Sequence, residues 1–305
     1  MEVVVHLGAH RTASTTLQIM LAVAGCVSHA ADLGVLCPPR PGWRPSRSIR
    51  GFVEELRRVP RWRQRLPGHR RRTTRKLLEL CPNADQPPRR LVVSEENLLG
   101  KIVSEKLPGL YPEAGLNAAR LFERTHLTPS KLFLTVRSYE TFLPSAFAME
   151  SCFADRPAPQ SAFRAVASDP GNGWLGVIRR LSQRFPGVPL VVWPHETTPL
   201  PERLTGLLGQ PFALCDALSA TIAVCHPSPT REAIAAVAQL RAASPQPALA
   251  KAEIDTVIRQ HADGTRPDPR EWFDEAHQNR LRTTYQDHLE AIRDFLANHP
   301  AQAHG

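Results

Sequence analysis

The chain opens with VVVHLGAHRTASTTLQ at residues 3–18, and this stretch decides the fold. Its first part, Val3–Leu7, is a short unbroken apolar run, which is typical of a strand buried on both faces of a parallel sheet. Small residues, an arginine and a cluster of hydroxyls follow, and a helix begins after Thr15. The unpaired N–H groups and the positive dipole end of such a helix start favour a bound phosphate. The sequence therefore predicts a strand, a phosphate-binding loop and a helix in succession.

Three more apolar runs predict further strands: Leu91–Val93, Leu132–Val136 and Leu190–Trp193. Long connections separate the four runs, which indicates βαβ crossovers. We therefore expect an α/β fold with an open, mainly parallel sheet and helices on both faces, a three-layer sandwich.

Beyond the last of these runs the apolar residues recur at helical spacing, which predicts a helical C-terminal part at about 228–298. Its three helices are expected over Thr230–Ala243, Lys251–Ala262 and Glu271–Leu296. The whole chain, 1–305, is expected to form one α/β domain. An Arg- and Pro-rich helical insertion at about 38–88 separates the first two predicted strands.

The formal net charge is +9, and its excess is concentrated at residues 57–76, RRVPRWRQRLPGHRRRTTRK, which hold no acidic residue. Two interpretations are favoured: a solvated pair of surface helices broken by prolines, or a cationic rim that attracts an anionic substrate. A nucleic-acid-binding arm is the third, less favoured because Trp62 is the one aromatic residue in the stretch.

The six cysteines are scattered, with no Cys-x-x-Cys and no paired Cys/His spacing, so we expect neither a disulfide framework nor a metal site. No apolar run approaches the ~18 residues of a membrane span. The first residues lack the pattern of a signal peptide, so a cytoplasmic protein is expected.

The ATP-binding motif G-x-x-x-x-G-K-[ST] fits the loop from Gly8 only in part. Ala13 stands where the second glycine belongs, and Ser14 stands where the lysine belongs. The cation of this loop is Arg11, three places earlier, which moves the positive charge toward the bridging region of a smaller donor. A P-loop kinase therefore stays an alternative that lacks its essential lysine.

The same loop resembles the 5′-phosphosulfate loop of the sulfotransferases that use 3′-phosphoadenosine 5′-phosphosulfate (PAPS). Bacterial members carry strings such as H-K-T-G-T-T-x-L-Q, and residues 10–18 here read HRTASTTLQ. The resemblance implies a P-loop-like fold, PAPS as donor, and donor binding by Arg11, Thr12, Ala13, Ser14, Thr15 and Thr16. Arg11 replaces the usual lysine; it neutralises a phosphate but is a poorer proton donor to the leaving oxygen. Ala13 replaces the usual glycine and fits if its φ stays negative.

The run that ends at Val136 leads into Arg137, and Ser145 follows eight places later within a predicted helix. Sulfotransferases resemble this pattern closely, and there the two residues hold the 3′-phosphate of the donor. A guanidinium at a strand end and a hydroxyl on the next helix can converge on one phosphate. Pro144 removes a backbone N–H from that helix and threatens to misplace Ser145.

Sulfuryl transfer requires a base that takes the proton of the acceptor. The run Leu91–Val93 is followed by Ser94-Glu95-Glu96, at the end of the strand where α/β sheets bind ligands. The family has a similar S-x-E at this strand end, so Glu96 is the first candidate for the base and Glu95 the second. His10 is a lesser candidate for a catalytic role, and His195 is expected to complete a turn.

Near the C-terminus, DGTR at 263–266 resembles the loop that closes over the 3′-phosphate in this family, which adds Gly264 and Arg266 as donor-binding candidates. No metal is expected, because arginines and backbone N–H groups meet the charge of the donor. The predicted function is transfer of a sulfuryl group from PAPS to an acceptor hydroxyl or amine of a carbohydrate or small molecule. The alternatives are the P-loop kinase and a polyanion- or nucleic-acid-binding protein on a degenerate nucleotide fold.

Overall fold

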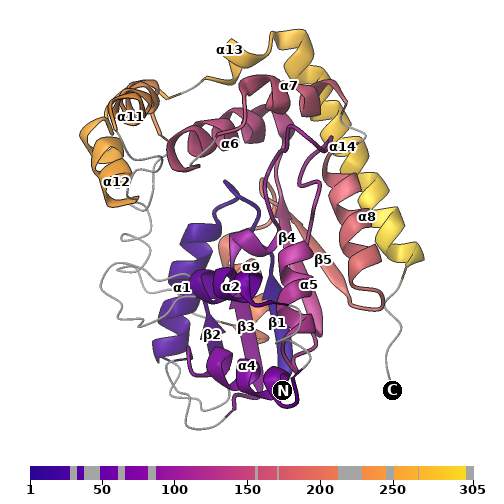
Figure 1. Ribbon diagram of the computed structural model, residues 1–305. Helices are drawn as coiled ribbons and strands as arrows, with labels where there is room; N and C mark the ends of the chain where they lie inside the picture. The colour runs from indigo at the N-terminus through magenta and orange to yellow at the C-terminus, as the bar shows by residue number, and fades with distance from the viewer. Residues whose placement is uncertain are drawn as a thin grey trace.

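The computed structural model describes residues 1–27, 33–37, 49–60, 66–81, 87–154, 157–169, 172–211, 229–244, 251–266 and 268–299. Its five strands are β1 (Glu2–His6), β2 (Leu33–Leu36), β3 (Arg90–Ser94), β4 (Lys131–Val136) and β5 (Leu190–Pro194). All pair in parallel, in the order β2-β3-β1-β4-β5 (Figure 1). The predicted α/β fold is therefore confirmed, with β1 at the centre of the sheet.

Strand β2 was not predicted. Its four residues, LGVL, include Gly34, which lowers the strand preference of so short a run. A Cβ on Gly34 would lie 2.8 Å from a side-chain carbon of Pro88, so the close packing there requires glycine. The Arg- and Pro-rich insertion consequently follows β2 rather than β1, and of its residues the structure describes α2 (Ile49–Arg58) and α4 (His69–Leu78).

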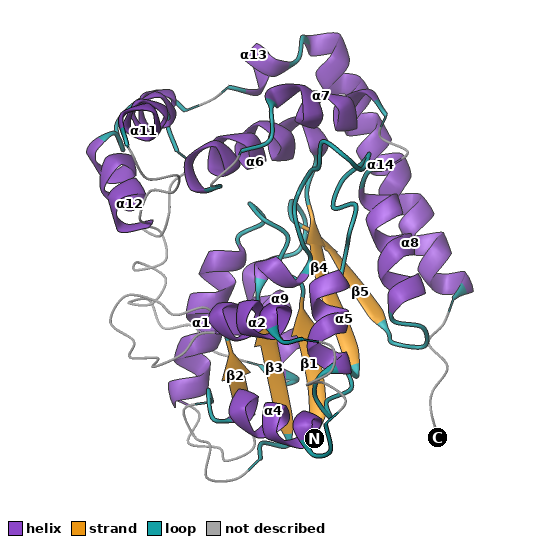
Figure 2. Ribbon diagram, viewed as in Figure 1, coloured by secondary structure: helices purple, strands orange, loops and turns teal. Residues whose placement is uncertain are grey.

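Helices cover both faces of the sheet (Figure 2). Along β1 the side chains alternate: Val3 and Val5 point into one apolar core, and Val4 into the other. The smaller core is completed by α1 (Ser14–Val27) and α9 (Leu200–Leu208). The larger core takes in side chains of α2, α4, α5 (Leu116–Glu123), α6 (Tyr139–Phe153), α7 (Gln160–Ser168) and α8 (Trp174–Arg184).

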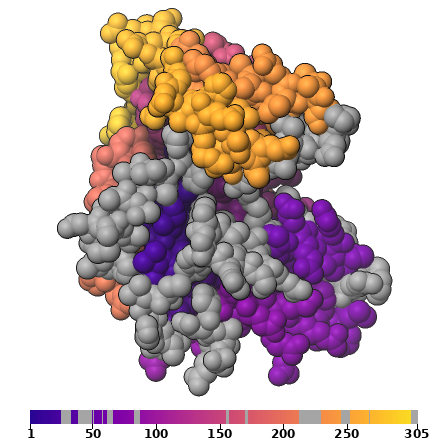
Figure 3. Space-filling model, turned by 90° about the vertical axis from the view of Figure 1, so that its left-hand side faces the viewer, coloured from indigo at the N-terminus to yellow at the C-terminus, as the bar shows by residue number. Residues whose placement is uncertain are grey.

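The C-terminal part is helical, as predicted, with α11 (Arg231–Ala243), α12 (Lys251–Gln260), α13 (Pro269–Trp272) and α14 (Glu275–Asn298). The single helix expected over Glu271–Leu296 is interrupted after Trp272, because Asp274 accepts a hydrogen bond from the N–H of His277 (2.7 Å) and caps a new helix. Leu281 and Ile292 on α14 are buried in the larger core. In Figure 3 the orange atoms of α11 and α12 stand above the purple atoms of residues 49–81.

The described end of the basic segment, helix α4, lies at the amino-terminal edge of the sheet, close to the N-terminus of the chain (Figure 1). Arg70 donates to the carbonyl of Thr125 (2.7 Å), and Thr74 accepts from the N–H of His126 (2.8 Å), on the loop that leads into β4. The loop after β1 lies at the opposite edge. The geometry of α4 therefore favours the solvated surface over the cationic rim. Among the described residues, no helix is both long and apolar enough to cross a membrane.

Candidate functional site

The loop between β1 and α1 has an unusual backbone. Gly8 (φ 28°), Arg11 (φ 62°) and Ala13 (φ 61°) all adopt positive φ. The condition that Ala13 keeps a negative φ is not met: the residue takes the left-handed conformation that glycine adopts freely. A non-glycine residue there costs roughly 1–2 kcal/mol. Arg11 and Ala13, where the turn is strained, are also two of the positions at which the chain departs from the sulfotransferase string.

Two of the predicted phosphate-binding hydroxyls are used inside the loop. Thr12 Oγ1 and Ser14 Oγ both donate to the carbonyl of Ala9, at 2.7 and 2.8 Å. Both side chains are buried, whereas Thr15 and Thr16, in the first turn of α1, are half-exposed. In this conformation Thr12 and Ser14 shape the loop, and the hydroxyls at its open side belong to Thr15 and Thr16.

The two half-motifs meet at the carboxyl ends of β1 and β4. Arg11 Nε donates to Ser145 Oγ at 2.9 Å, and Arg137 Nη1 donates to the carbonyl of Arg11 at 2.8 Å. Helix α6 continues through Pro144, so the proline does not displace Ser145 from the loop. Two arginines and a hydroxyl from segments about 130 residues apart thus share one small region, an arrangement suited to an anion.

Several charged groups act on these two arginines. The pKa of Arg11 is lowered to about 10, mainly by burial and also by the neighbouring charges of Arg137 and Arg266, whereas Glu96 acts in the opposite direction. Burial also lowers the pKa of Arg137. Cations crowded in a low-dielectric region gain most from a bound anion, because the anion removes their mutual repulsion.

The two glutamates after β3 have different surroundings. Glu95 is fully buried, and its carboxylate accepts from the N–H of Asn97 (3.0 Å). This hydrogen bond makes Glu95 the N-cap of the 3₁₀-helix η1 (Glu96–Leu98). Glu96 is half-exposed, and its Cα lies 3.4 Å from the position of a Cβ built on Gly8. Glu96 is therefore the carboxylate beside the loop, and Glu95 has a structural role.

His10 is tied to Tyr111, a residue that the sequence did not single out. The Tyr111 hydroxyl accepts from the backbone N–H of His10 (2.9 Å) and lies 3.1 Å from Nδ1 of the His10 ring. The hydroxyl either donates to Nδ1 or accepts from it, depending on the tautomer of the ring. Either way, Tyr111 holds the backbone and one ring nitrogen of His10.

The C-terminal loop holds two donor-binding candidates, Gly264 and Arg266, and one of them acts on the phosphate loop. Gly264 packs against α11: a Cβ there would lie 2.3 Å from a carboxylate oxygen of Glu232 and 3.0 Å from Thr230 Oγ1. Glu232 also accepts from the N–H of Thr265 (2.9 Å). Gly264 therefore serves the packing of this loop, whereas Arg266 is close enough for its charge to act on Arg11.

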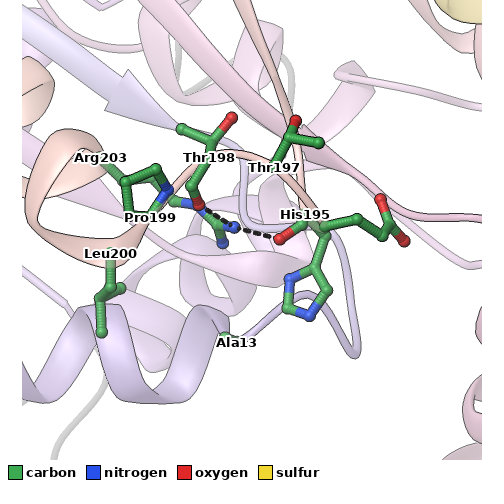
Figure 4. A pocket seen from close by; sticks show the side chains of 8 residues that line it. Ala13, His195, Thr197, Thr198, Pro199, Leu200 and Arg203 are labelled. Atoms are coloured by element: carbon green, nitrogen blue, oxygen red, sulfur yellow. Dashed lines mark hydrogen bonds between the residues drawn. The ribbon is translucent and has the colours of Figure 1, made fainter.

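A cavity of about 310 Å³ adjoins the phosphate loop at Ala13 (Figure 4). His195 and the turn after β5 form its other side, with the buried Arg203 beneath. Arg203 donates to the carbonyls of His195 (2.9 Å) and Thr12 (3.3 Å), which joins the turn to the loop. Burial lowers the pKa of His195, so its ring is neutral near pH 7. No motif singles out Arg203, which lies on α9, well after the end of strand β5.

No protein-family model matches the chain, and a search of curated proteins finds no match. A solved sulfotransferase is similar. It is the crystal structure of mouse sulfotransferase SULT7A1 complexed with PAP, with 11% identity over 97% of this chain and 88% of that chain, and a TM-score of 0.38. A likeness this distant carries no argument about the site. Within the described residues, no group of three or more His, Cys, Asp or Glu side chains is placed to hold a metal ion.

Proposed function

We propose that this chain is a PAPS-dependent sulfotransferase that transfers a sulfuryl group to a hydroxyl or amine of a carbohydrate or small molecule. The observation that carries the proposal is the meeting of Arg11, Ser145 and Arg137 at the carboxyl edge of the sheet. An ATP-type loop would need a lysine near the helix start, and Ser14 stands there instead.

In the proposed complex, the 5′-phosphosulfate of the donor lies over the first turn of α1, where N–H groups, Thr15, Thr16 and Arg11 face it. Arg137, Ser145 and Arg266 bind the 3′-phosphate. The nucleoside occupies the cavity beside Ala13, which is continuous with the loop. Arginines and N–H groups neutralise this donor without a metal. We propose a cytoplasmic location and kinship with the bacterial enzymes on the same basis as the loop resemblance.

The transfer step is an in-line displacement at sulfur. The acceptor oxygen or nitrogen forms a bond to sulfur while the bond from sulfur to the 5′-phosphate oxygen breaks, and 3′,5′-adenosine bisphosphate (PAP) leaves with that electron pair. Glu96 takes the proton of the acceptor. Arg11 stabilises the charge that develops on the leaving oxygen.

Calorimetric titration with PAP, 5′-AMP, ATP–Mg²⁺ and a DNA oligomer tests the donor site. We expect PAP to bind most tightly. Arg11→Ala should weaken PAP at least tenfold, about 1.4 kcal/mol. Arg137→Ala should weaken PAP but not 5′-AMP, which has no 3′-phosphate.

Each contrary result has a definite meaning. Preference for ATP–Mg²⁺ would replace the proposal by the kinase. Binding of DNA alone would favour the polyanion-binding alternative, with the exposed arginines of α4 as its surface.

A further inference from the structure

Arg137 is surrounded by charges that it does not touch. Its guanidinium donates to Thr141 Oγ1 (3.1 Å) and to the carbonyl of Arg11 (2.8 Å). Burial lowers the pKa of Arg137, and nearby acidic groups act in the opposite direction. Among these groups, Glu196 has the largest effect. In the part of the chain that the structure describes, these two opposite charges form no ion pair.

The reason is that both oxygens of Glu196 are held elsewhere. One accepts from the N–H of Ser138 (2.9 Å), directly after Arg137, and the other accepts from the Tyr285 hydroxyl (2.8 Å). Glu196 is exposed to solvent, so these two hydrogen bonds, rather than packing, fix its direction.

Tyr285 belongs to α14, far from the predicted motifs in sequence, and only 2% of its surface is exposed. Burial and the neighbouring Glu196 carboxylate raise the pKa of Tyr285 well above its ordinary value. Its hydroxyl thus stays protonated and remains a donor to Glu196 at any working pH.

We propose that Tyr285 is a positioning residue for anion binding: its hydroxyl holds Glu196 away from Arg137 and keeps that guanidinium for the 3′-phosphate of the donor. Without the hydroxyl, a Glu196 oxygen can turn to Arg137, and a carboxylate paired with a guanidinium occupies the same N–H donors that a phosphate needs. This inference rests on the proposed function, because it assumes that Arg137 binds the 3′-phosphate.

Calorimetry with PAP and 5′-AMP on four proteins tests it: the wild type, Tyr285→Phe, Tyr139→Phe and the double variant Tyr285→Phe/Glu196→Gln. Tyr285→Phe should weaken PAP about fivefold, the order of the net contribution of one hydrogen bond, and leave 5′-AMP unchanged. The double variant should regain PAP affinity, because glutamine still accepts from Ser138 but has no charge to pair with Arg137.

Tyr139→Phe is the matched control. Tyr139 is also buried, and its hydroxyl bonds His288 Nδ1 (2.7 Å) rather than Glu196, so its loss should not alter the ratio of the two affinities. An unaltered ratio in Tyr285→Phe, equal losses for both nucleotides, or no recovery in the double variant would overturn the inference. A wild type that does not prefer PAP over 5′-AMP would overturn the proposed function itself, and the inference with it.

Discussion

At the scale of single residues, the backbone of Ala13 in the phosphate loop is strained. Its φ of 61° is one that glycine adopts without strain. Ala13→Gly should therefore stabilise the folded chain by about 1 kcal/mol, the strain relieved less the extra chain entropy of glycine. Differential scanning calorimetry measures this as a higher Tm.

The reverse change at Gly68 is the control. Gly68 has φ 73° with open space around its Cβ position, so Gly68→Ala tests the backbone cost alone. It should destabilise the chain by a similar amount, about 1 kcal/mol. A lower Tm for Ala13→Gly would show that the alanine methyl group is worth more than the strain.

Glu96 and Glu95 are adjacent but differ in role. Glu96→Gln should leave PAP affinity intact and lower turnover by ~10²–10⁴, the usual contribution of a positioned base. Glu95→Ala should instead lower the free energy of unfolding by about 1–2 kcal/mol, because it removes the cap on Asn97. Sulfuryl transfer assays with an acceptor found by screening measure the first effect, and urea unfolding the second. Full turnover in Glu96→Gln would exclude it as the base.

At the scale of elements, the side chain of Arg241 bonds helix α11 to the end of α6, beside an apolar cluster that contains Cys152 and Val237. Arg241 donates to the carbonyls of Ser151, Cys152 (2.7 Å) and Ala154 (2.8 Å), which end α6 without intrahelical partners. Arg241→Met should cost about 2 kcal/mol and speed hydrogen exchange in α11 and α12 while the sheet stays protected.

Arg259→Met is the control for that experiment. Arg259 is exposed on α12 and bonds a threonine within its own helix (3.2 Å), so its loss should leave exchange unchanged. Faster exchange throughout the sheet in Arg241→Met would mean that α11 and the sheet unfold together.

How far the sequence predicts the elements depends on the range of the interactions that form them. The strands in unbroken apolar runs were predicted, because burial on both faces leaves a local pattern. Arg137 and Ser145 could be placed near Arg11, because the carboxyl ends of parallel strands share one edge of the sheet. Tyr111 and Tyr285 could not be predicted, since tertiary packing alone brings a distant loop and the last helix to that edge.

At the scale of the whole molecule, stability should depend on pH through buried histidines. Burial lowers the pKa of His6, on the central strand, to about 3, from an ordinary value near 6.5. Between these values the unfolded chain binds the proton and the folded chain does not, so stability is complete above pH 6.5 and falls as the pH decreases. One such group gives a slope of about 1.4 kcal/mol per pH unit.

Urea unfolding of the wild type and His6→Asn at pH 7.5 and pH 5 measures this slope. The variant should lose less stability between the two pH values, because asparagine takes up no proton. His126→Asn, at an exposed position before β4, should behave as the wild type does. Equal pH dependence in all three proteins would show that His6 does not determine acid sensitivity.

The central place of β1 has a consequence for synthesis. Val3 pairs with Leu91 of β3, and Val5 pairs with Leu132 of β4, so β1 has no neighbour in the sheet until the long stretch that leads to β3 has been made. Contacts this distant in sequence form slowly, because a long loop must close before they stabilise anything. Tyr285 comes later still. A nascent chain therefore carries its phosphate loop long before Tyr285, which completes the anion site around that loop, has been made.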